Sequence, residues 1–190
     1  MTPLFHEKIS LGILAGGRGS RLNGADKAFI RYENQYLSQR ILSMLDTRFA
    51  AQLISAREQD ARYRQMNLEP VFDTRAAFSG PLAGIEALLE ACKTEYLLII
   101  PVDIKYLPRD VIAQWLGAPE RPGLALHDSN GLQPLFALWH VPDSLQTVTQ
   151  SLDQQAQAVH SVISQLNFKI ITRTDIQIGN LNSPQDFETP

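Results

Sequence analysis

The sequence predicts an α/β fold of three layers, in which a doubly wound, mostly parallel sheet is covered by helices on both faces. Short apolar runs rich in β-branched residues alternate along the chain with longer amphipathic runs, which is the pattern of βαβ units. The length of 190 residues fits one domain, and 44% hydrophobic residues are enough to bury a sizeable core. Because no repeat or linker-like segment divides the chain, we expect residues 1–190 to form a single domain.

Four apolar runs before residue 102 predict buried strands. The run at 96–101 is the clearest, because a wholly apolar run is typical of a parallel strand that is buried on both faces. Amphipathic runs between the strands place apolar residues at helical spacing, and one of them opens with Pro81, which suits a first helical turn. The expected strands are 9–15, 52–55, 70–72 and 96–101, and the expected helices are 37–45, 81–93 and 108–116.

The last third of the chain predicts a hairpin and further helical segments. Apolar runs at 123–126 and 132–139 flank the turn Asp128-Ser-Asn-Gly131, which is a hairpin signal. We therefore expect an antiparallel edge addition to the parallel sheet. An amphipathic stretch at 159–166, a strand at 169–172 and a helix that begins at Ser183-Pro184 complete the expected order.

Charge and cysteine content exclude several classes of function. With 17 Lys and Arg against 20 Asp and Glu, the net charge of −3 gives no broad positive field for nucleic acid or a membrane surface. The single cysteine, Cys92, excludes an internal disulfide and a cysteine zinc cluster, which fits a reducing compartment. The N-terminus has no signal-peptide core, and the longest apolar run is far shorter than the ~20 residues that span a bilayer. We expect a soluble, cytoplasmic protein.

The loop after the first expected strand is suited to bind a polyphosphate. It reads Leu14-Ala-Gly-Gly-Arg-Gly-Ser-Arg-Leu-Asn-Gly-Ala-Asp-Lys27. Its glycines leave backbone N–H groups open to phosphate oxygens, and Arg18, Arg21 and Lys27 supply positive charge. It is neither a Rossmann fingerprint nor a Walker A loop, and the alternative interpretation is a solvated turn.

Three more polar clusters follow expected strands, and ligands of such sheets bind beyond the carboxyl ends of the strands. Asp73 precedes the glycine-rich helix start Gly80-Pro-Leu-Ala-Gly84, where a sugar hydroxyl or a phosphate could bind. Asp103 directly follows a wholly apolar strand and suits Mg²⁺, which takes one or two carboxylates together with substrate phosphates; its nearest cation in sequence is Lys105. Asn180 and Asn182 share a face if extended. Helix and turn caps are the alternative interpretation of all three clusters.

Taken in order, these motifs resemble the molybdenum cofactor guanylyltransferase (MobA) family of nucleotidyltransferases. The resemblance covers essentially the whole chain. It is carried by Leu14-Ala-Gly-Gly17 with Arg21 and Asp26-Lys27, by Asp73 with Gly80-Pro-Leu-Ala-Gly84, by Pro101-Val-Asp103 with Leu107-Pro108, by Gln133-Pro-Leu-Phe136, and by Asn180-Leu-Asn182-Ser-Pro184.

The resemblance implies a nucleotide-diphospho-sugar transferase-like fold and an Mg²⁺-dependent reaction. GMP would pass from GTP to the phosphate of a molybdopterin-type cofactor, with release of pyrophosphate. Proteins that deliver molybdopterin, or apo-molybdoenzymes that receive the product, would be partners. The implied residues are Arg21, Lys27 and Asp103 for catalysis, with Asp103 also the metal ligand; Leu14, Ala15, Gly16, Gly17, Lys27, Asp73 and Asp103 for the nucleotide; and Gly80, Lys105, Asn180 and Asn182 on the acceptor side.

The chain departs from the family pattern in three places. Arg57 lies nearest to where the family often has an asparagine associated with guanine, and Ile104-Lys105 follows Asp103 where a proline is usual. Residues 153–167, which correspond to an arginine-rich segment of the family, contain no Lys or Arg. Lys105 and Arg75 are then the nearest candidate cations for the acceptor. Alternatives are a cytidylyltransferase or sugar-phosphate nucleotidyltransferase of the same fold, or a nucleotide-binding protein without turnover.

Overall fold

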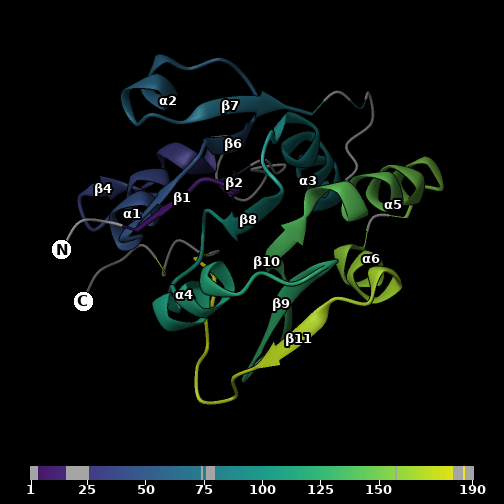
Figure 1. Ribbon diagram of the computed structural model, residues 1–190. Coiled ribbons are helices and arrows are strands. Elements are labelled where there is room, and N and C mark those ends of the chain that lie inside the picture. Colours follow the sequence, from purple (N-terminus) through teal and green to yellow (C-terminus); the bar gives the residue numbers. More distant parts are fainter. Residues whose placement is uncertain are drawn as a thin grey trace.

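A computed structural model describes residues 4–15, 26–73, 75, 80–156, 158–181 and 186 (Figure 1). Its main feature is a seven-stranded sheet in the order β11-β9-β10-β8-β2-β6-β7. Two small two-stranded sheets, β1-β5 and β3-β4, lie outside it. The strands are β1 (Leu4–His6), β2 (Ile9–Leu14), β3 (Arg31–Tyr32), β4 (Gln35–Tyr36), β5 (Thr47–Phe49), β6 (Gln52–Ala56), β7 (Glu69–Phe72), β8 (Tyr96–Pro101), β9 (Gly123–Asp128), β10 (Gly131–His140) and β11 (Lys169–Thr172).

The strand directions confirm the expected mostly parallel sheet. β2 pairs in parallel with both β8 and β6, and β6 pairs in parallel with β7. Only β10 runs against its neighbours in the main sheet, since it is antiparallel to both β8 and β9. The antiparallel strand therefore lies inside the sheet and not at its edge, because β11 adds in parallel to β9 and forms the outer edge.

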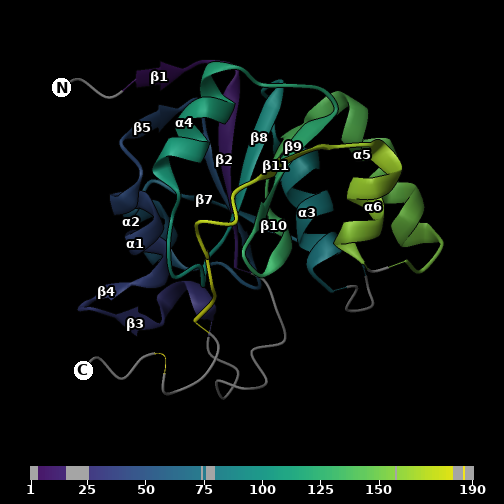
Figure 2. The ribbon, with the colours of Figure 1, turned by 90° about the horizontal axis from the view of Figure 1, so that it is seen from below.

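Helices cover both faces of the sheet (Figures 1 and 2). One face packs against α1, α2 and α4 around a core that contains Tyr63 and Trp115, and the other packs against α3, α5 and α6 around a core that contains Trp139. None of these helices is long and apolar enough to cross a membrane, as far as the described residues go. The helices are the 3₁₀ helix η1 (Lys27–Phe29), α1 (Leu37–Met44), α2 (Ala61–Gln65), α3 (Gly80–Ala91), α4 (Arg109–Gly117), α5 (Val141–Asp153) and α6 (Val159–Leu166).

Every strand and helix expected within the described residues is present, with bounds that shift by one or two residues. The helix expected from Ser183 lies outside the described residues. The sequence pattern did not predict α5, the short helix α2, the 3₁₀ helix η1 or the two small sheets. Of these, η1 matters most for function, because it carries Lys27.

Candidate active site

The candidate site residues gather at the carboxyl end of the parallel strands. Ala15 directly follows β2, Asp73 directly follows β7, and Asp103 is the second residue after the end of β8. All three lie at the same edge of one sheet. In such sheets this edge is where ligands bind. The strand order, with β2 between β8 and β6, brings these loops together although they are far apart in sequence.

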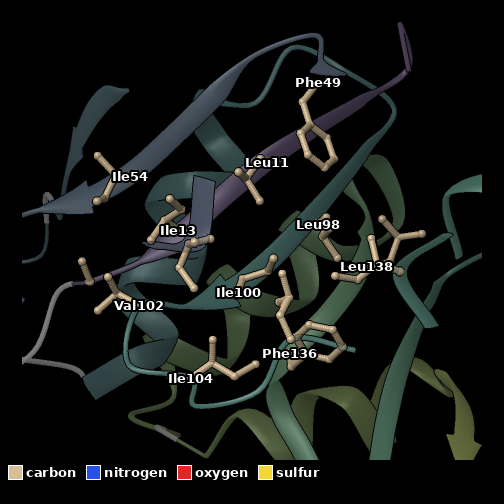
Figure 3. Packing of buried hydrophobic residues seen from close by; sticks show 14 of the residues in the cluster. Leu11, Ile13, Phe49, Ile54, Leu98, Ile100, Val102, Ile104, Phe136 and Leu138 are labelled. Carbon is tan, nitrogen blue, oxygen red and sulfur yellow. The ribbon is translucent and has the colours of Figure 1, made fainter. Parts of the chain in front are cut away.

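Asp103 points out of the core because its two neighbours point in. Val102 and Ile104 are 1% and 0% exposed and pack beneath the end of β8 (Figure 3). Asp103 lies in the turn between these two residues, and its side chain is 15% exposed. The carboxylate is therefore set at the sheet edge by the apolar packing on either side of it.

Lys27 is the partner of Asp103. Its Nζ lies 2.6 Å from Asp103 Oδ2, and the two side chains are 25% and 15% exposed. Lys105, expected from the sequence to be the cation near Asp103, instead pairs with Asp186. A cation and a carboxylate in direct contact, both open to solvent on one side, can each bind part of a metal-bound polyphosphate.

The 3₁₀ helix η1 is fixed from several sides, which places Lys27. The Asp26 carboxylate caps the helix by accepting from the Ala28 N–H at 2.9 Å. The buried Tyr63 hydroxyl donates to the other Asp26 oxygen, and burial, together with this bond, raises the pKa of Tyr63 above its usual value. Ser38 Oγ donates to the Ala28 carbonyl at 2.8 Å. These hydrogen bonds therefore fix the backbone of the short helix that carries Lys27.

Leu14 and Ala15 form the buried end of β2. The Ala15 N–H donates to Ser55 Oγ at 3.0 Å, and Ser55 is paired with Leu14 in the neighbouring strand β6. A Cβ on Gly84 would lie 2.8 Å from Leu14 Cδ1, so glycine lets α3 approach β2 closely. Gly80, which starts α3, has φ of +67°, a conformation that suits glycine. The glycines of this helix start thus serve packing and backbone geometry in the described structure.

Asp73 is exposed, and its Oδ1 accepts from the Arg75 N–H at 2.9 Å. The Arg75 guanidinium turns away from the sheet edge and makes two 2.6 Å bonds to the carboxylate of Glu86 on α3. It also bonds Asp153 on α5 at 2.9 Å. The Arg75 hydrogen bonds lower the pKa of Glu86, which is otherwise buried. Arg75, one of the expected acceptor cations, is therefore committed to two carboxylates.

The segment after β11 runs back to the Asp103 loop (Figure 2). Asn180 forms a bridge with Ile104, and the Leu181 N–H donates to the Asp103 carbonyl at 2.7 Å. These bonds place the backbone of Asn180 beside the Asp103 loop. The structure thus brings Lys27, Asp103 and Asn180 together beside the end of β2. Arg21, Gly16, Gly17 and Asn182 lie outside the described residues.

The described side chains offer a carboxylate for Mg²⁺ at the sheet edge. These contain no group of three or more histidine, cysteine, aspartate or glutamate residues that could hold a metal ion by themselves. Asp103 supplies one partly exposed carboxylate. Mg²⁺ commonly binds through one or two carboxylates, substrate phosphates and waters, so this donor set fits a metal that arrives with a nucleotide.

Two of the residues that support the site carried a weak sequence signal. Ser55 is a polar residue in a buried strand, and its hydroxyl meets the end of β2. Tyr63 is fully buried on a short helix that has little hydrophobic pattern. A polar group inside an apolar strand could have drawn attention to Ser55, whereas nothing local in the sequence connects Tyr63 with Asp26.

The chain matches the family model described as the MobA-like NTP transferase domain over residues 11–169. A molybdenum cofactor guanylyltransferase of Yersinia pseudotuberculosis is 30% identical over 177 residues, which cover 92% of this chain and 90% of the relative. The corresponding protein of Yersinia pestis is 29% identical over the same length.

Solved structures show the same fold. The molybdopterin-guanine dinucleotide biosynthesis protein A of Archaeoglobus fulgidus superposes with a TM-score of 0.72 at 16% identity, over 94% of each chain. The 2-C-methyl-D-erythritol 4-phosphate cytidylyltransferase of Thermus thermophilus gives a TM-score of 0.69 at 13% identity, over 93% of this chain and 94% of the other. At such low identity the likeness concerns the fold alone.

Proposed function

Because the chain belongs to the MobA-like NTP transferase family, we propose that this nucleotidyltransferase uses GTP and Mg²⁺ to guanylylate a molybdopterin-type cofactor. An oxygen of the acceptor phosphate would attack the α-phosphorus of GTP. The new P–O bond joins GMP to the acceptor, and the bond to the β-phosphate breaks to release pyrophosphate. The proposed setting is the cytoplasm, where a chain with one unpaired cysteine stays reduced.

The observation that carries the proposal is the Lys27–Asp103 pair at the carboxyl edge of the sheet. Phosphoryl transfer needs positioning and neutralisation of charge more than covalent catalysis by the protein. Asp103 would hold Mg²⁺, which supplies positive charge to the phosphates when bound. Lys27 would exchange its contact with Asp103 for a phosphate oxygen, a charge-assisted bond of about the same kind.

The other residues take positioning roles in this proposal. Leu14 and Ala15, with Gly16 and Gly17 after them, would line the nucleotide, and Arg21 would add a second cation. Asp73, whose carboxylate is exposed at the end of β7, would accept from a nucleoside hydroxyl. Each of these contacts restricts the movement of GTP, and orientation of this kind lowers the barrier without forming any covalent intermediate.

The acceptor side rests on fewer charges. Arg75 is bound to Glu86 and Asp153, which leaves Lys105 as the cation that we propose for the acceptor phosphate, beside Gly80, Asn180 and Asn182. Lys105 is about half exposed and pairs with the partly exposed carboxylate of Asp186. Exposed pairs of this type are worth about 0–1 kcal/mol, so an anionic ligand can compete for the ammonium group. A protein that delivers molybdopterin, or an apo-molybdoenzyme, would supply further contacts.

The test is a pyrophosphate-release assay with GTP, CTP or ATP, each with and without molybdopterin and Mg²⁺. We expect release only with GTP, acceptor and metal together. Asp110→Asn is a suitable control, because Asp110 is an exposed carboxylate on α4 that pairs with Arg173. A preference for CTP would mean that CTP, and not GTP, is the nucleotide donor. Tight GTP binding without turnover on any acceptor would indicate a nucleotide-binding protein instead of an enzyme.

A further inference from the structure

The loop that carries Asp103 is held from two sides by its backbone. On one side the carbonyls of Ile104 and Lys105 accept from α1, and on the other side the N–H groups of Lys105 and Tyr106 donate to the segment after β11. The first set of bonds comes from the buried Arg40, and the second set is connected through Ile178 to the buried Asp128. Neither of these two side chains touches the exposed face of Asp103.

Arg40 holds the first side. It lies in α1, is 8% exposed, and its Nη1 donates to the Ile104 carbonyl at 2.7 Å while its Nη2 donates to the Lys105 carbonyl. The guanidinium also packs over the Tyr32 ring, 5.4 Å from the ring centroid. No carboxylate pairs with it within the described part of the chain. A buried guanidinium is costly unless its donors are used, and here carbonyls of the Asp103 loop use them.

Asp128 holds the second side. It ends β9, is 0% exposed, and accepts from the Asn130 N–H, the Gln133 side-chain amide and the Ile178 N–H at 2.8–2.9 Å. Within the described residues, the hydrogen bonds to this carboxylate come from neutral N–H groups, with no cation among them. Three such bonds satisfy a buried carboxylate only while all three donors stay in place.

The Ile178 bond connects Asp128 to the site. The Ile178 carbonyl accepts from the N–H groups of Lys105 and Tyr106 at 3.1 and 2.9 Å. Three residues later the Leu181 N–H donates to the Asp103 carbonyl at 2.7 Å. A shift of Ile178 would therefore move the bonds that fix the backbone of Asp103 itself.

We propose that Arg40 and Asp128 are positioning residues, two buried charges that hold the Asp103 loop between α1 and the C-terminal segment and thereby set the affinity of Asp103 for a divalent cation. The proposal rests on the proposed function, because it takes Asp103 as the metal ligand. It assigns to each residue an effect on metal binding beyond its effect on stability. Conservative variants can separate the two effects.

Two variants keep the shape of these side chains. Lysine in Arg40→Lys can reach only one carbonyl at a time, since it lacks the planar fork that serves two. In Asp128→Asn the new amide NH₂ group must face the backbone N–H of Asn130 or of Ile178, so one of them loses its acceptor. The matched controls are Arg109→Gln, an exposed arginine near the same loop, and Asp110→Asn.

The experiment measures three quantities on the full chain: Mn²⁺ binding in the presence of GTP by electron paramagnetic resonance, GTP binding without metal, and hydrogen exchange of the Lys105, Tyr106 and Leu181 amides. We expect both conservative variants to bind Mn²⁺ about tenfold more weakly than the native protein and to exchange these amides faster. GTP binding without metal should change less than threefold, and both controls should behave as the native protein.

Unchanged Mn²⁺ affinity in Arg40→Lys and Asp128→Asn, even with a lower melting temperature, would overturn the positioning role and leave a purely structural one. Equal losses in the control variants would overturn it as well. A native protein that binds Mn²⁺ with GTP yet transfers nothing to molybdopterin would contradict the proposed acceptor while leaving this inference intact. If the native protein does not bind Mn²⁺ with GTP, both fail.

Discussion

Lys27 and Arg75 are cations in comparable places, since each lies in the segment that follows a parallel strand of the sheet. Their partners differ. Lys27 pairs with Asp103 at the partly exposed sheet edge, whereas Arg75 is bound to Glu86 on α3 and to Asp153 on α5. A cation at the sheet edge, where ligands of such sheets bind, can move to a phosphate. A cation held between carboxylates of two helices stabilises the packing of those helices. Loop position alone does not distinguish these roles.

The largest effect is expected at Asp103. Asp103→Asn should lower Mg²⁺-dependent transfer by at least ~10²-fold, a few kcal/mol of transition-state stabilisation, because a neutral amide is a poor ligand for Mg²⁺. The fold should be nearly unchanged, since the side chain is partly exposed and not part of the core. Initial rates over a range of Mg²⁺ concentrations, with Asp46→Asn as control, would show it. Near-native turnover of this variant at limiting Mg²⁺ would show that Asp103 is not the metal ligand.

Lys27→Met against Arg75→Gln tests the comparison directly. Loss of one charge-assisted phosphate contact costs about 1.5–3 kcal/mol, so Lys27→Met should weaken GTP binding by about 10- to 100-fold. Arg75→Gln should leave GTP affinity within about threefold, because its guanidinium already belongs to Glu86 and Asp153. Calorimetry with GTP and Mg²⁺ measures both. If Arg75→Gln lost as much affinity as Lys27→Met, the division of roles would be wrong.

Lys105→Ala extends the comparison to the acceptor. Because the Lys105 side chain is about half exposed and pairs with Asp186 at the surface, we expect its ammonium group to be available to an acceptor phosphate. The variant should raise the apparent KM for molybdopterin about tenfold and leave the KM for GTP nearly unchanged. Steady-state kinetics with each substrate varied in turn would measure the split. Unchanged acceptor kinetics in this variant would place Lys105 outside the site. The control is Lys169→Ala, which removes an exposed lysine from β11.

The fold was largely predictable from the sequence because apolar runs and helical spacing are local signals. α5 shows where this fails: Val141, Leu145, Val148 and Leu152 recur at helical spacing, but the serine, threonine and glutamine residues between them resemble a loop. The short strands of the two small sheets have only two or three residues each and so carry almost no periodicity.

The sequence indicated individual candidate residues for the site, but it did not indicate their partners. Glycines, cations and a carboxylate after apolar strands indicated Lys27 and Asp103, yet 76 residues separate them, and only the strand order brings them together. Arg40 lies on an amphipathic helix where an arginine normally faces solvent, and here it is buried against two carbonyls. Pairing of this kind depends on the tertiary structure, which local sequence patterns do not contain.

The smallest effect on activity is expected from Glu86, the main partner of Arg75. Glu86→Gln should change GTP affinity by less than twofold and lower the free energy of unfolding at pH 7 by about 1–3 kcal/mol, because two charge-assisted bonds to Arg75 weaken. The hydrogen bonds from Arg75 lower the pKa of Glu86 in the folded protein. A depressed carboxylate pKa stabilises the fold above the unfolded value of about 4.3, and this stabilisation is lost as the pH falls through the folded pKa. Urea unfolding at pH 7 and near pH 3 would show the stability difference between native protein and variant shrinking with acid. If this stability difference stays constant over the pH range, the charges of the Arg75–Glu86 pair do not stabilise the packing of α3. The contrast with Lys27 would then depend on geometry alone.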